Sequence, residues 1–428
     1  MYRIFIFLYL CALRLAAIWN PKARLWVRGR KSVIPEMRRR FQGEHRQVVW
    51  FHCASLGEFE QGRPLIEALR ESHPDICILL TFFSPSGYEA CKTYAGADHI
   101  LYLPMDSPGN ARRFLDACSP SFAVFVKYEF WHFYLRALSG RGIPTLLVSA
   151  VFRPDQPFFR WYGGFWRNML GAYSRIFVQD ESSLTLLEDL GFGGKAVLSG
   201  DTRFDRVLEI TRGAGAIAHD AGAIRHDAAP KGIPAAADFA GDGPVIVAGS
   251  TWSEDEKELA HFVRTHPDVR FILAPHEIGK DHLREIAHRF PDHVLYSEYC
   301  KKPVQAQCLV IDNIGMLSRL YQYAAITYVG GGFAGDGVHN VLEPAVWGKP
   351  VVFGPIYDKY REATELLQSG GGFTASTTLE LEKCLEHLLH DPAGLEKAGR
   401  SARTYVENKA GATRRILGYI QENRLLTN

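Results

Sequence analysis

From Gln47 onward, short apolar runs alternate with amphipathic segments along the whole chain. Such runs predict strands that are buried on both faces, and the helical patterns between them predict βαβ units with parallel sheets. In the first half the predicted strands are Val48–His52, Ile76–Phe82, His99–Leu103, Phe122–Val126, Thr145–Val148 and Arg175–Val178. In the second half they are Val245–Ala248, Arg270–Leu273, Cys308–Ile311, Ala325–Val329 and Pro350–Phe353.

The two halves are separated by Glu209–Gly243, a segment rich in Ala, Gly and Asp that is typical of an interdomain connection with an irregular insert. We therefore expect an α/β protein with two Rossmann-like domains facing a central cleft, where ligands bind at the carboxyl ends of the strands. The expected division is 1–46 for an N-terminal anchor and basic segment, 47–208 for the first domain, 209–243 for the linker or insert, 244–408 for the second domain, and 409–428 for a C-terminal helix that packs back on the first domain.

The first residues, Met1–Trp19, are almost wholly apolar but are interrupted by Arg3 and Arg14. The unbroken run Ile4–Leu13 is about half of the roughly 20 residues needed to span a bilayer. A helix here would place both arginines on one face, so we predict an interfacial or shallowly inserted membrane anchor. A secretory signal is not favoured, because no cleavage site is evident after the apolar run. The alternative to an anchor is a buried N-terminal helix followed by a solvated charge run.

Charge is distributed unevenly along the chain, although its formal net charge is only +2. Residues 1–46 carry eleven basic and two acidic side chains, a net +9, whereas the remainder carries −7. This asymmetry indicates an anionic surface as partner, and the basic residues after the apolar stretch favour a cytoplasmic location for the body.

The overall composition, 47% hydrophobic and 22% charged, is that of an ordinary globular protein and excludes disordered and collagen-like classes. Eight cysteines occur without any C-x-x-C pair, which argues against a zinc site and against a disulfide framework. We therefore expect reduced cysteines in a cytosolic compartment.

A glycine-rich segment, Tyr328–Pro344, directly follows a predicted strand. Gly330, Gly332 and Gly335 formally satisfy the dinucleotide fingerprint G-x-G-x-x-G. Its late position in the domain and the proline at its end argue against NAD or FAD. A turn and short helix that receive a single phosphate are favoured, with Glu343 accepting hydrogen bonds from a ribose diol and Asn340 beside it. A tight strand–helix turn with a capping asparagine is the alternative.

Three other turns in the second half also follow predicted strands, namely Gly249–Thr251, Pro275–His276 and Ile314–Met316. Each turn alone is weak evidence, because caps and turns occur in any α/β protein. Four loops at the ends of successive parallel strands make a stronger case for one shared ligand.

In the first half, Glu58 lies on the turn between the first predicted strand and the following helix. A carboxylate placed there can take a proton from an attacking hydroxyl, or it can merely complement the helix N-terminus. Position alone does not separate these two roles. Lys127–Glu129 and Ser199–Asp205 offer further polar groups at strand ends, where Arg203 meets an anionic substrate or forms a surface salt bridge.

Four motifs together resemble the 3-deoxy-D-manno-octulosonic acid (Kdo) transferases of lipopolysaccharide synthesis. They are A-S-x-G-E at Ala54–Glu58, S-G-x-x-x-F-D at Ser199–Asp205, G-S-T at Gly249–Thr251, and G-G…H-N-x-L-E-P-A…G-K-P-V-x-F-G-P at Gly331–Pro355. The resemblance covers nearly the whole chain, and the Gly331–Pro355 block is its most specific part. It implies a GT-B fold and transfer of Kdo from CMP-Kdo to a lipid A precursor (lipid IVA) with inversion.

By this resemblance the catalytic base falls on Glu58, in the acceptor domain, and the second domain binds CMP-Kdo. The donor-binding candidates, including the loop residues described above, are Ser250, Thr251, Pro275, His276, Ile314, Gly315, Met316, Gly331, Gly332, Asn340, Val341, Leu342 and Glu343. The chain departs from the commoner family pattern at Pro275–Ile278, at Gly315–Met316 and at Glu129–Phe133.

No cofactor or metal is expected, because CMP-Kdo carries a single phosphate and no D-x-D motif stands at a strand end. The expected partners are CMP-Kdo, the lipid A precursor and the anionic inner leaflet at the cytoplasmic face of the inner membrane, with no nucleic acid. The alternatives are a GT-B transferase that uses a UDP-sugar, like lipid A disaccharide synthase, and a non-catalytic membrane protein that binds sugar nucleotides.

Overall fold

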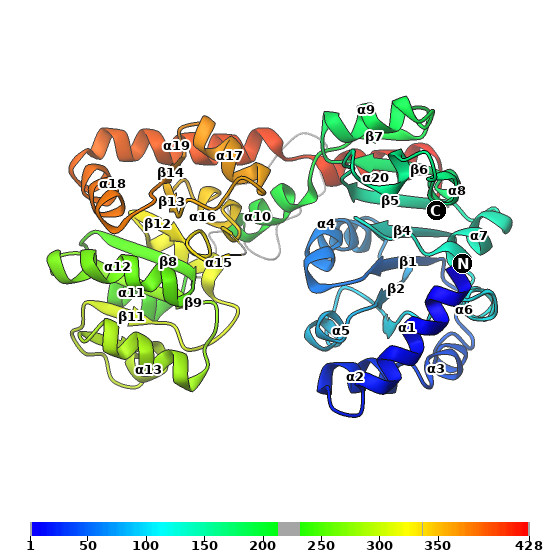
Figure 1. Cartoon of the computed structure of the whole chain (residues 1–428), viewed down its shortest axis with the longest axis horizontal. Coiled ribbons are helices and arrows are strands. Elements are labelled where there is room, and N and C mark those ends of the chain that lie inside the picture. Colours follow the sequence, from blue (N-terminus) through cyan, green and yellow to red (C-terminus); the bar gives the residue numbers. More distant parts are fainter. Residues whose placement is uncertain (1, 213–231, 336, 427–428) are drawn as a thin grey trace. The chain divides into compact units, whose positions relative to one another are not determined.

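The computed structural model describes residues 2–212, 232–335 and 337–426. The chain forms two compact units, one made of Met1–Arg206 with Ala410–Asn428 and the other of Val207–Lys409. Each unit is built on one seven-stranded parallel sheet with helices on its faces (Figure 1). The two Rossmann-like α/β units predicted from the sequence are therefore present.

The first sheet has the strand order β3-β2-β1-β4-β5-β6-β7. Its strands are β1 (Val48–Cys53), β2 (Cys77–Phe82), β3 (His99–Tyr102), β4 (Phe122–Val126), β5 (Thr145–Ala150), β6 (Arg175–Val178) and β7 (Ala196–Leu198). The order reverses between β1 and β4, and this is the point at which open α/β sheets form a ligand crevice beyond the strand ends.

Alternate residues of β1 enter separate apolar layers on the two faces of the first sheet. Val48 and Trp50 belong to one layer, whereas Val49 and Phe51 belong to the other. Because side chains alternate across a strand and both faces are covered, the strand reads as a continuous apolar run.

Helices of the first unit lie before, between and after these strands. They are α1 (Tyr2–Ala16), α2 (Pro21–Gly29), α3 (Val33–Arg40), α4 (Leu56–Ser72), α5 (Pro85–Cys91), α6 (Pro108–Cys118), α7 (His132–Gly140), η1 (Pro157–Phe159), α8 (Gly164–Ala172), α9 (Glu181–Asp189) and α20 (Ala412–Glu422), and α10 (Thr202–Arg212) begins here. The C-terminal helix α20 buries Ile416 and Ile420 in the layer that also holds Val49 and Phe51.

Asp205, in the first turn of α10, attaches α20 to the first unit. Its carboxylate accepts hydrogen bonds from the backbone N–H groups of Gly411 and Thr413, at 2.6 and 2.7 Å, and from the Thr413 hydroxyl at 2.9 Å. The aspartate of the S-G-x-x-x-F-D motif thus caps the start of α20 from another part of the chain.

The second sheet has the strand order β10-β11-β9-β8-β12-β13-β14. Its strands are β8 (Val245–Thr251), β9 (Arg270–Pro275), β10 (His293–Leu295), β11 (Cys308–Val310), β12 (Ile326–Val329), β13 (Val351–Phe353) and β14 (Gly372–Thr374). Here the order reverses between β8 and β12, so the loops after these strands flank the second crevice.

The helices of the second unit include one that the sequence did not predict. They are α11 (Pro234–Ala240), α12 (Ser253–Thr265), α13 (Lys280–Arg289), α14 (Tyr296–Tyr299), α15 (Leu317–Leu320), η2 (Tyr321–Tyr323), α16 (Leu342–Ala345), α17 (Arg361–Gln368), α18 (Thr378–His390) and α19 (Pro392–Lys409). Helix α11 lies inside the predicted linker, yet it buries Ala236 and Phe239 in the core of the second unit. Residues 213–231 of that linker lie outside the described residues.

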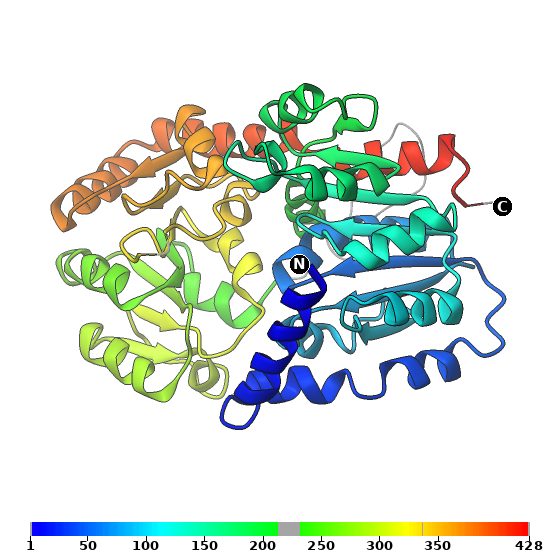
Figure 2. The ribbon, with the colours of Figure 1, turned by 45° about the vertical axis from the view of Figure 1, so that its right-hand side comes forward.

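At the N-terminus, α1 and α2 pack against each other (Figure 2). Tyr9 of α1 meets the Trp26 ring of α2 edge-on, with ring centroids 6.3 Å apart. Of the side chains of α1, only Ile6 is fully buried. Among the described residues, no helix combines the length and apolar character needed to cross a bilayer.

Candidate active site

Glu58 lies in the first turn of α4, directly after the loop that ends β1. Its Oε2 accepts hydrogen bonds from the Ser55 backbone N–H at 2.8 Å and from the Ser55 hydroxyl at 3.1 Å, which completes a capping box. Oε1 accepts no hydrogen bond from any described residue. One oxygen therefore complements the helix N-terminus, and the other remains available for proton transfer.

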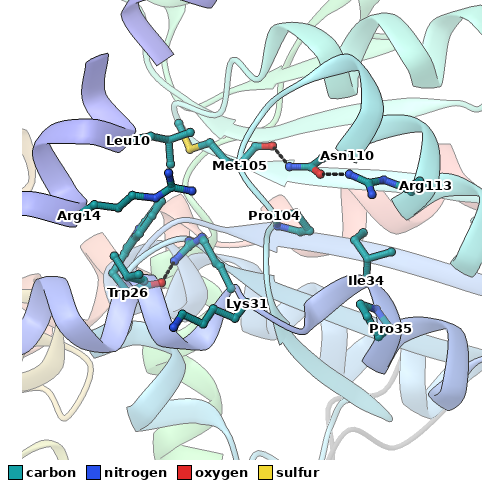
Figure 3. A pocket seen from close by; sticks show the side chains of 12 residues that line it. Leu10, Arg14, Trp26, Lys31, Ile34, Pro35, Pro104, Met105, Asn110 and Arg113 are labelled. Carbon is teal, nitrogen blue, oxygen red and sulfur yellow. Dashed lines mark hydrogen bonds between the residues drawn. The ribbon is translucent and has the colours of Figure 1, made fainter. Parts of the chain in front are cut away.

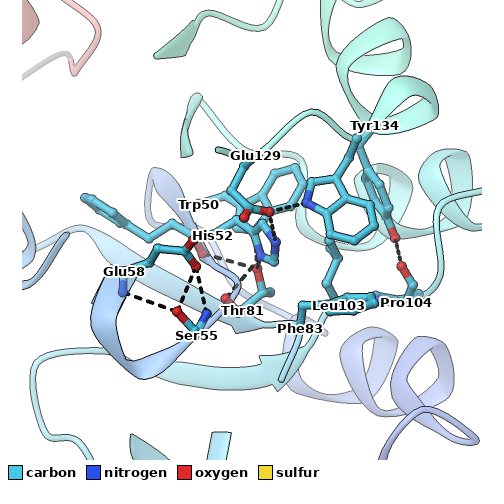
Figure 4. Close-up of polar contacts among 12 residues, drawn as sticks. Trp50, His52, Ser55, Glu58, Thr81, Phe83, Leu103, Pro104, Glu129 and Tyr134 are labelled. Atoms are coloured by element: carbon cyan, nitrogen blue, oxygen red, sulfur yellow. Dashed lines mark hydrogen bonds and ion pairs between the residues drawn. The ribbon is translucent and has the colours of Figure 1, made fainter. Parts of the chain in front are cut away.

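A second carboxylate, that of Glu129, lies on the other side of the strand reversal, after β4 (Figure 4). Glu129 is 4% exposed and accepts a hydrogen bond from the indole N–H of Trp131. Its Oε2 lies 2.9 Å from Nε2 of His52, at ion-pair distance but without hydrogen-bond alignment.

The other ring nitrogen of His52, Nδ1, contacts Thr81 on the neighbouring strand β2. Nδ1 lies 3.1 Å from the carbonyl oxygen of Thr81 and 2.9 Å from its hydroxyl oxygen. A carbonyl can only accept, so Nδ1 carries a proton and donates it. Nε2 is then the ring nitrogen that faces the Glu129 carboxylate.

Burial raises the pKa of Glu58, and the negative charge of Glu129 raises it further, while the hydrogen bonds from Ser55 and the nearby His52 oppose the shift. A carboxylate whose pKa is raised toward neutrality is a better proton acceptor for an alcohol than an ordinary surface glutamate. The crevice of the first unit thus holds a base of enhanced strength at the place where the fold binds ligands.

In the second unit, the four predicted segments lie at or just after the carboxyl ends of β11, β9, β8 and β12, which are consecutive neighbours in the sheet. Gly249–Thr251, predicted as a turn, is instead the last part of β8, and Pro275 is the last residue of β9. All four strands are parallel, so their carboxyl ends and the loops after them lie at one edge of the sheet. The sheet therefore brings together the segments that hold the donor-binding candidates.

Three aromatic side chains form a platform at this edge. The rings of Trp252 and His339 are nearly coplanar, at 14°, and the indole N–H donates to Nε2 of His339 over 2.8 Å. His276 stacks on both, with ring centroids 4.5 Å from Trp252 and 4.7 Å from His339. His276 is exposed, whereas Trp252 and His339 are half-buried.

The glycine-rich turn after β12 is shaped by close backbone packing. A Cβ at Gly330 would collide with the backbone of Ser250 and Thr251, and one at Gly332 would collide with the backbone of Gly354. The buried carboxylate of Asp255 accepts the N–H of Gly331 at 2.8 Å. The following helix α16 has only four residues, so the long helix of a dinucleotide site is absent from this part of the described chain.

The donor-binding candidates differ in accessibility. His276, Ile314 and Gly315 are exposed, and Ser250, Met316, Asn340 and Glu343 are half-buried. The buried ones are Thr251, Pro275, Gly331, Gly332, Val341 and Leu342. The Thr251 hydroxyl donates to the buried Glu256 at 3.1 Å, so this side chain supports the loop from within.

Asn340 and Glu343 are linked to each other at the start of α16. The Asn340 amide donates to Glu343 at 3.1 Å, and its oxygen accepts the Leu342 N–H at 3.1 Å. The N-cap of α16 is Val341, so the asparagine is not the cap itself but forms a turn just before the helix. It also holds the carboxylate of Glu343 at the edge of the sheet.

Sequence reasoning did not identify several members of these sites. Glu129 was noted only as a polar group after a strand, and its partner His52 lies within an apolar run. Trp252 and His339 adjoin predicted loops, but nothing in their spacing indicates that they meet. Arg203 forms an ion pair with Asp201 at 2.7 Å, in agreement with the salt-bridge interpretation.

Comparison with known sequences now relates these sites to a family. Residues 30–206 match the family model described as 3-deoxy-D-manno-octulosonic-acid transferase (kdotransferase). The 3-deoxy-D-manno-octulosonic acid transferase of Aquifex aeolicus is 28% identical, over 80% of this chain and 86% of that protein. The transferase of the same name from Haemophilus influenzae is 26% identical, over 88% of this chain and 87% of that protein.

Comparison with solved structures supports the fold. UDP-GlcNAc 2-epimerase from Neisseria meningitidis, bound to UDP-GlcNAc, superposes with a TM-score of 0.59 at 15% identity, covering 88% of this chain and 100% of that one. A further UDP-N-acetylglucosamine 2-epimerase gives 0.57 at 16% identity, over 87% of this chain and 95% of that one. These structures share the GT-B arrangement of two parallel-sheet domains. The family match over residues 30–206 and the relatives along most of the chain thus support a glycosyltransferase similar to the Kdo transferases, and the solved structures support its fold.

Proposed function

We propose that this protein is an inverting glycosyltransferase that moves Kdo from CMP-Kdo to a phosphorylated lipid A precursor. Similarity to the Kdo transferases supports the sugar and the reaction class. The observation that carries the mechanism is Glu58, a carboxylate of raised pKa beside the strand reversal of the first sheet.

In this mechanism the ionised Glu58 takes the proton of the acceptor hydroxyl, whose oxygen forms a bond to the anomeric carbon of Kdo. The bond from that carbon to the phosphate oxygen breaks, and CMP leaves with the electron pair. Oε2 stays in the capping box with Ser55, which fixes the direction in which Oε1 is presented. A base held in this way loses little freedom on binding substrate.

We assign the donor to the loops at the carboxyl edge of the second sheet. Cytosine is planar, and the exposed face of His276 is a surface on which it can stack. Glu343, held by Asn340, is placed to accept hydrogen bonds from a ribose diol. The one phosphate of CMP needs no metal bridge of the kind used for diphosphates, so we propose a reaction without a metal ion or other cofactor.

We propose that the acceptor is reached at the cytoplasmic face of the inner membrane, with α1 as the membrane contact. Several apolar side chains of this segment face solvent; those at helical spacing include Ile4, Leu8, Leu15 and Ile18, and Phe5, Phe7 and Trp19 are exposed beside them. An apolar stripe next to a segment of net charge +9 suits an interfacial helix on an anionic leaflet.

The experiment that tests this function offers the purified protein a lipid A precursor with either CMP-Kdo or a UDP-sugar and analyses the lipid by mass spectrometry. We expect addition of Kdo from CMP-Kdo alone. Transfer from the UDP-sugar would support the alternative transferase. Binding of CMP-Kdo without any product would indicate the non-catalytic sensor.

A further inference from the structure

A cavity of about 470 Å³ lies in the first unit, with residues of α1 in its wall (Figure 3). Its walls come from α1, α2, α3, the Pro104–Met105 segment and the start of α6. The residues that line it are Leu10, Arg14, Trp26, Val27, Arg30, Lys31, Ile34, Pro35, Pro104, Met105, Asn110 and Arg113. None of the candidate site residues described above is among them.

The cavity is strongly cationic. Four basic residues line it, and the described residues of its wall include no aspartate or glutamate. It also borders the first turns of α6, where the positive end of the helix dipole adds to the potential. An anion in the cavity would therefore be attracted by α1, by the turn between α2 and α3, and by α6.

The four cations do not have the same role. Arg30 donates to the backbone carbonyls of Leu103, Trp26 and Phe83, at 2.9, 3.2 and 2.6 Å, and its guanidinium lies 3.9 Å from the Trp26 ring centroid. Burial lowers its pKa to about 9. Arg30 therefore holds the α2 end against the sheet and is a structural member of the wall.

The other three cations, Arg14, Lys31 and Arg113, are exposed at the rim. Figure 3 shows Arg14 extending from α1 over the cavity. Arg113 is oriented by Asn110, whose side-chain oxygen accepts from it at 2.8 Å, while the Asn110 amide donates to the Met105 carbonyl at 2.8 Å. The side chains of Arg14 and Lys31 form no hydrogen bond or ion pair with any described residue.

The remaining wall is apolar, formed by side chains such as Leu10, Trp26, Ile34 and Met105. The cavity adjoins α1, on which Leu8 and Leu15 are exposed. Leu8 lies two residues before Leu10, and Leu15 directly follows Arg14. A ligand that suits both features has an anionic head and an apolar tail. The phosphate of a free metabolite would use only the cationic side chains and would leave the apolar wall uncovered.

We propose that this cavity binds the phosphate of a membrane lipid head group, with Arg14, Lys31 and Arg113 as its ligands and the acyl chains directed along α1. The proposal rests on the membrane association given under the proposed function. Two lipids carry this chemistry, an anionic glycerophospholipid and the phosphorylated acceptor itself. Binding to either would orient the first unit on the leaflet.

The first arm of the test titrates the full-length protein with a short-chain phosphatidylglycerol kept below its micelle concentration, so that no charged surface exists. The triple variant Arg14→Gln/Lys31→Gln/Arg113→Gln is compared with Lys22→Gln/Arg38→Gln/Arg39→Gln. The control removes the same charge from exposed residues of the basic segment that do not line the cavity. We expect saturable binding to wild type and control, and binding at least about tenfold weaker to the cavity variant.

The second arm measures KM for the phosphorylated acceptor in detergent without phospholipid. A raised KM in the cavity variant alone, with kcat unchanged, would identify the acceptor as the source of the phosphate. Loss of phosphatidylglycerol binding with an unchanged KM would identify the phospholipid. Equal behaviour of the two triple variants in both arms overturns the cavity proposal, and so does absence of binding to wild type. Absence of Kdo transfer by wild type in the same detergent assay would instead overturn the proposed function.

Discussion

Nε2 of His52 lies 2.9 Å from Oε2 of Glu129, in a buried pair that flanks the strand reversal of the first sheet. Because Nδ1 of His52 donates to the carbonyl of Thr81, Nε2 is the ring nitrogen that faces Glu129. Glu58 is the neighbouring carboxylate, and its pKa responds to both members of the pair. The two acids of this crevice therefore differ in their surroundings, since Glu58 lies in a capping box and Glu129 is buried against His52.

Replacing Glu129 by glutamine should shift the pH dependence of transfer. The negative charge of Glu129 raises the pKa of Glu58, and the variant removes this charge. The variant also removes the carboxylate that faces His52, and His52 lowers the pKa of Glu58. The first effect is the larger one, so the pKa of Glu58 falls and the base is ionised at lower pH. We expect the ascending limb of the kcat/KM profile to move to lower pH.

The matched control for this profile is Glu89→Gln, which removes a surface carboxylate paired with Lys92 on α5. Its profile should coincide with that of wild type. A limb that moves to higher pH in Glu129→Gln, or that does not move, would contradict the coupling of Glu129 to Glu58.

Membrane attachment through α1 predicts sensitivity to charge on its exposed face. Phe7, which is 64% exposed, should contribute little to folding but much to partition into the leaflet. Phe7→Glu should reduce binding to anionic vesicles by about tenfold or more, because an apolar side chain leaves the interface and a like charge enters. Vesicle co-sedimentation measures the effect. Leu379→Glu is the control, since Leu379 is 62% exposed on α18. Equal losses in both variants would refute α1 as the contact.

The attachment of α20 by Asp205 predicts a loss of stability that is separate from chemistry. Asp205→Ala removes the acceptor of three hydrogen bonds at the start of the helix. The free energy of unfolding should fall by about 1–2 kcal/mol, the usual cost of losing a cap. Urea denaturation monitored by circular dichroism gives this value, and Asp205→Asn should lose less. An unchanged midpoint for Asp205→Ala would show that α20 is held by its apolar face alone.

The exposed ring of His276 predicts a contribution to nucleotide affinity. Loss of one stacking surface costs about 1–3 kcal/mol, so His276→Ala should weaken CMP binding by about tenfold. Calorimetric titration with CMP and UDP measures this and compares the two bases. His293→Ala, a histidine of the edge strand β10, is the control and should leave CMP affinity unchanged. Wild-type affinity in His276→Ala would remove this ring from the donor site.

Much of the fold could be predicted because buried parallel strands are apolar throughout. All eleven predicted strands are present, with ends that differ by at most a few residues. The three strands that were missed are β7, β10 and β14, each three residues long and each at the edge of a sheet. An edge strand pairs on one side only, so its sequence needs neither length nor a continuous apolar run.

The sites could be predicted less completely, because loops meet through the topology of the sheet. Glu58 follows a strand and precedes a helix, which the sequence reveals directly. Its neighbours Glu129 and His52 come from another loop and from within β1, and only the strand order places them together. In the second unit, Val341 and Leu342 stand inside the most specific motif yet are fully buried, so they shape the loop instead of facing a ligand.

The central claim, that Glu58 is the base of Kdo transfer, is tested most directly by Glu58→Gln. Glutamine can keep the capping box with Ser55, so the helix and the fold should persist. Transfer of Kdo from CMP-Kdo to the lipid acceptor and binding of CMP-Kdo are measured side by side, with Glu60→Gln on the same helix as control. We expect a loss of kcat of about 10²-fold or more with CMP-Kdo affinity retained. Near-normal turnover by Glu58→Gln would contradict it.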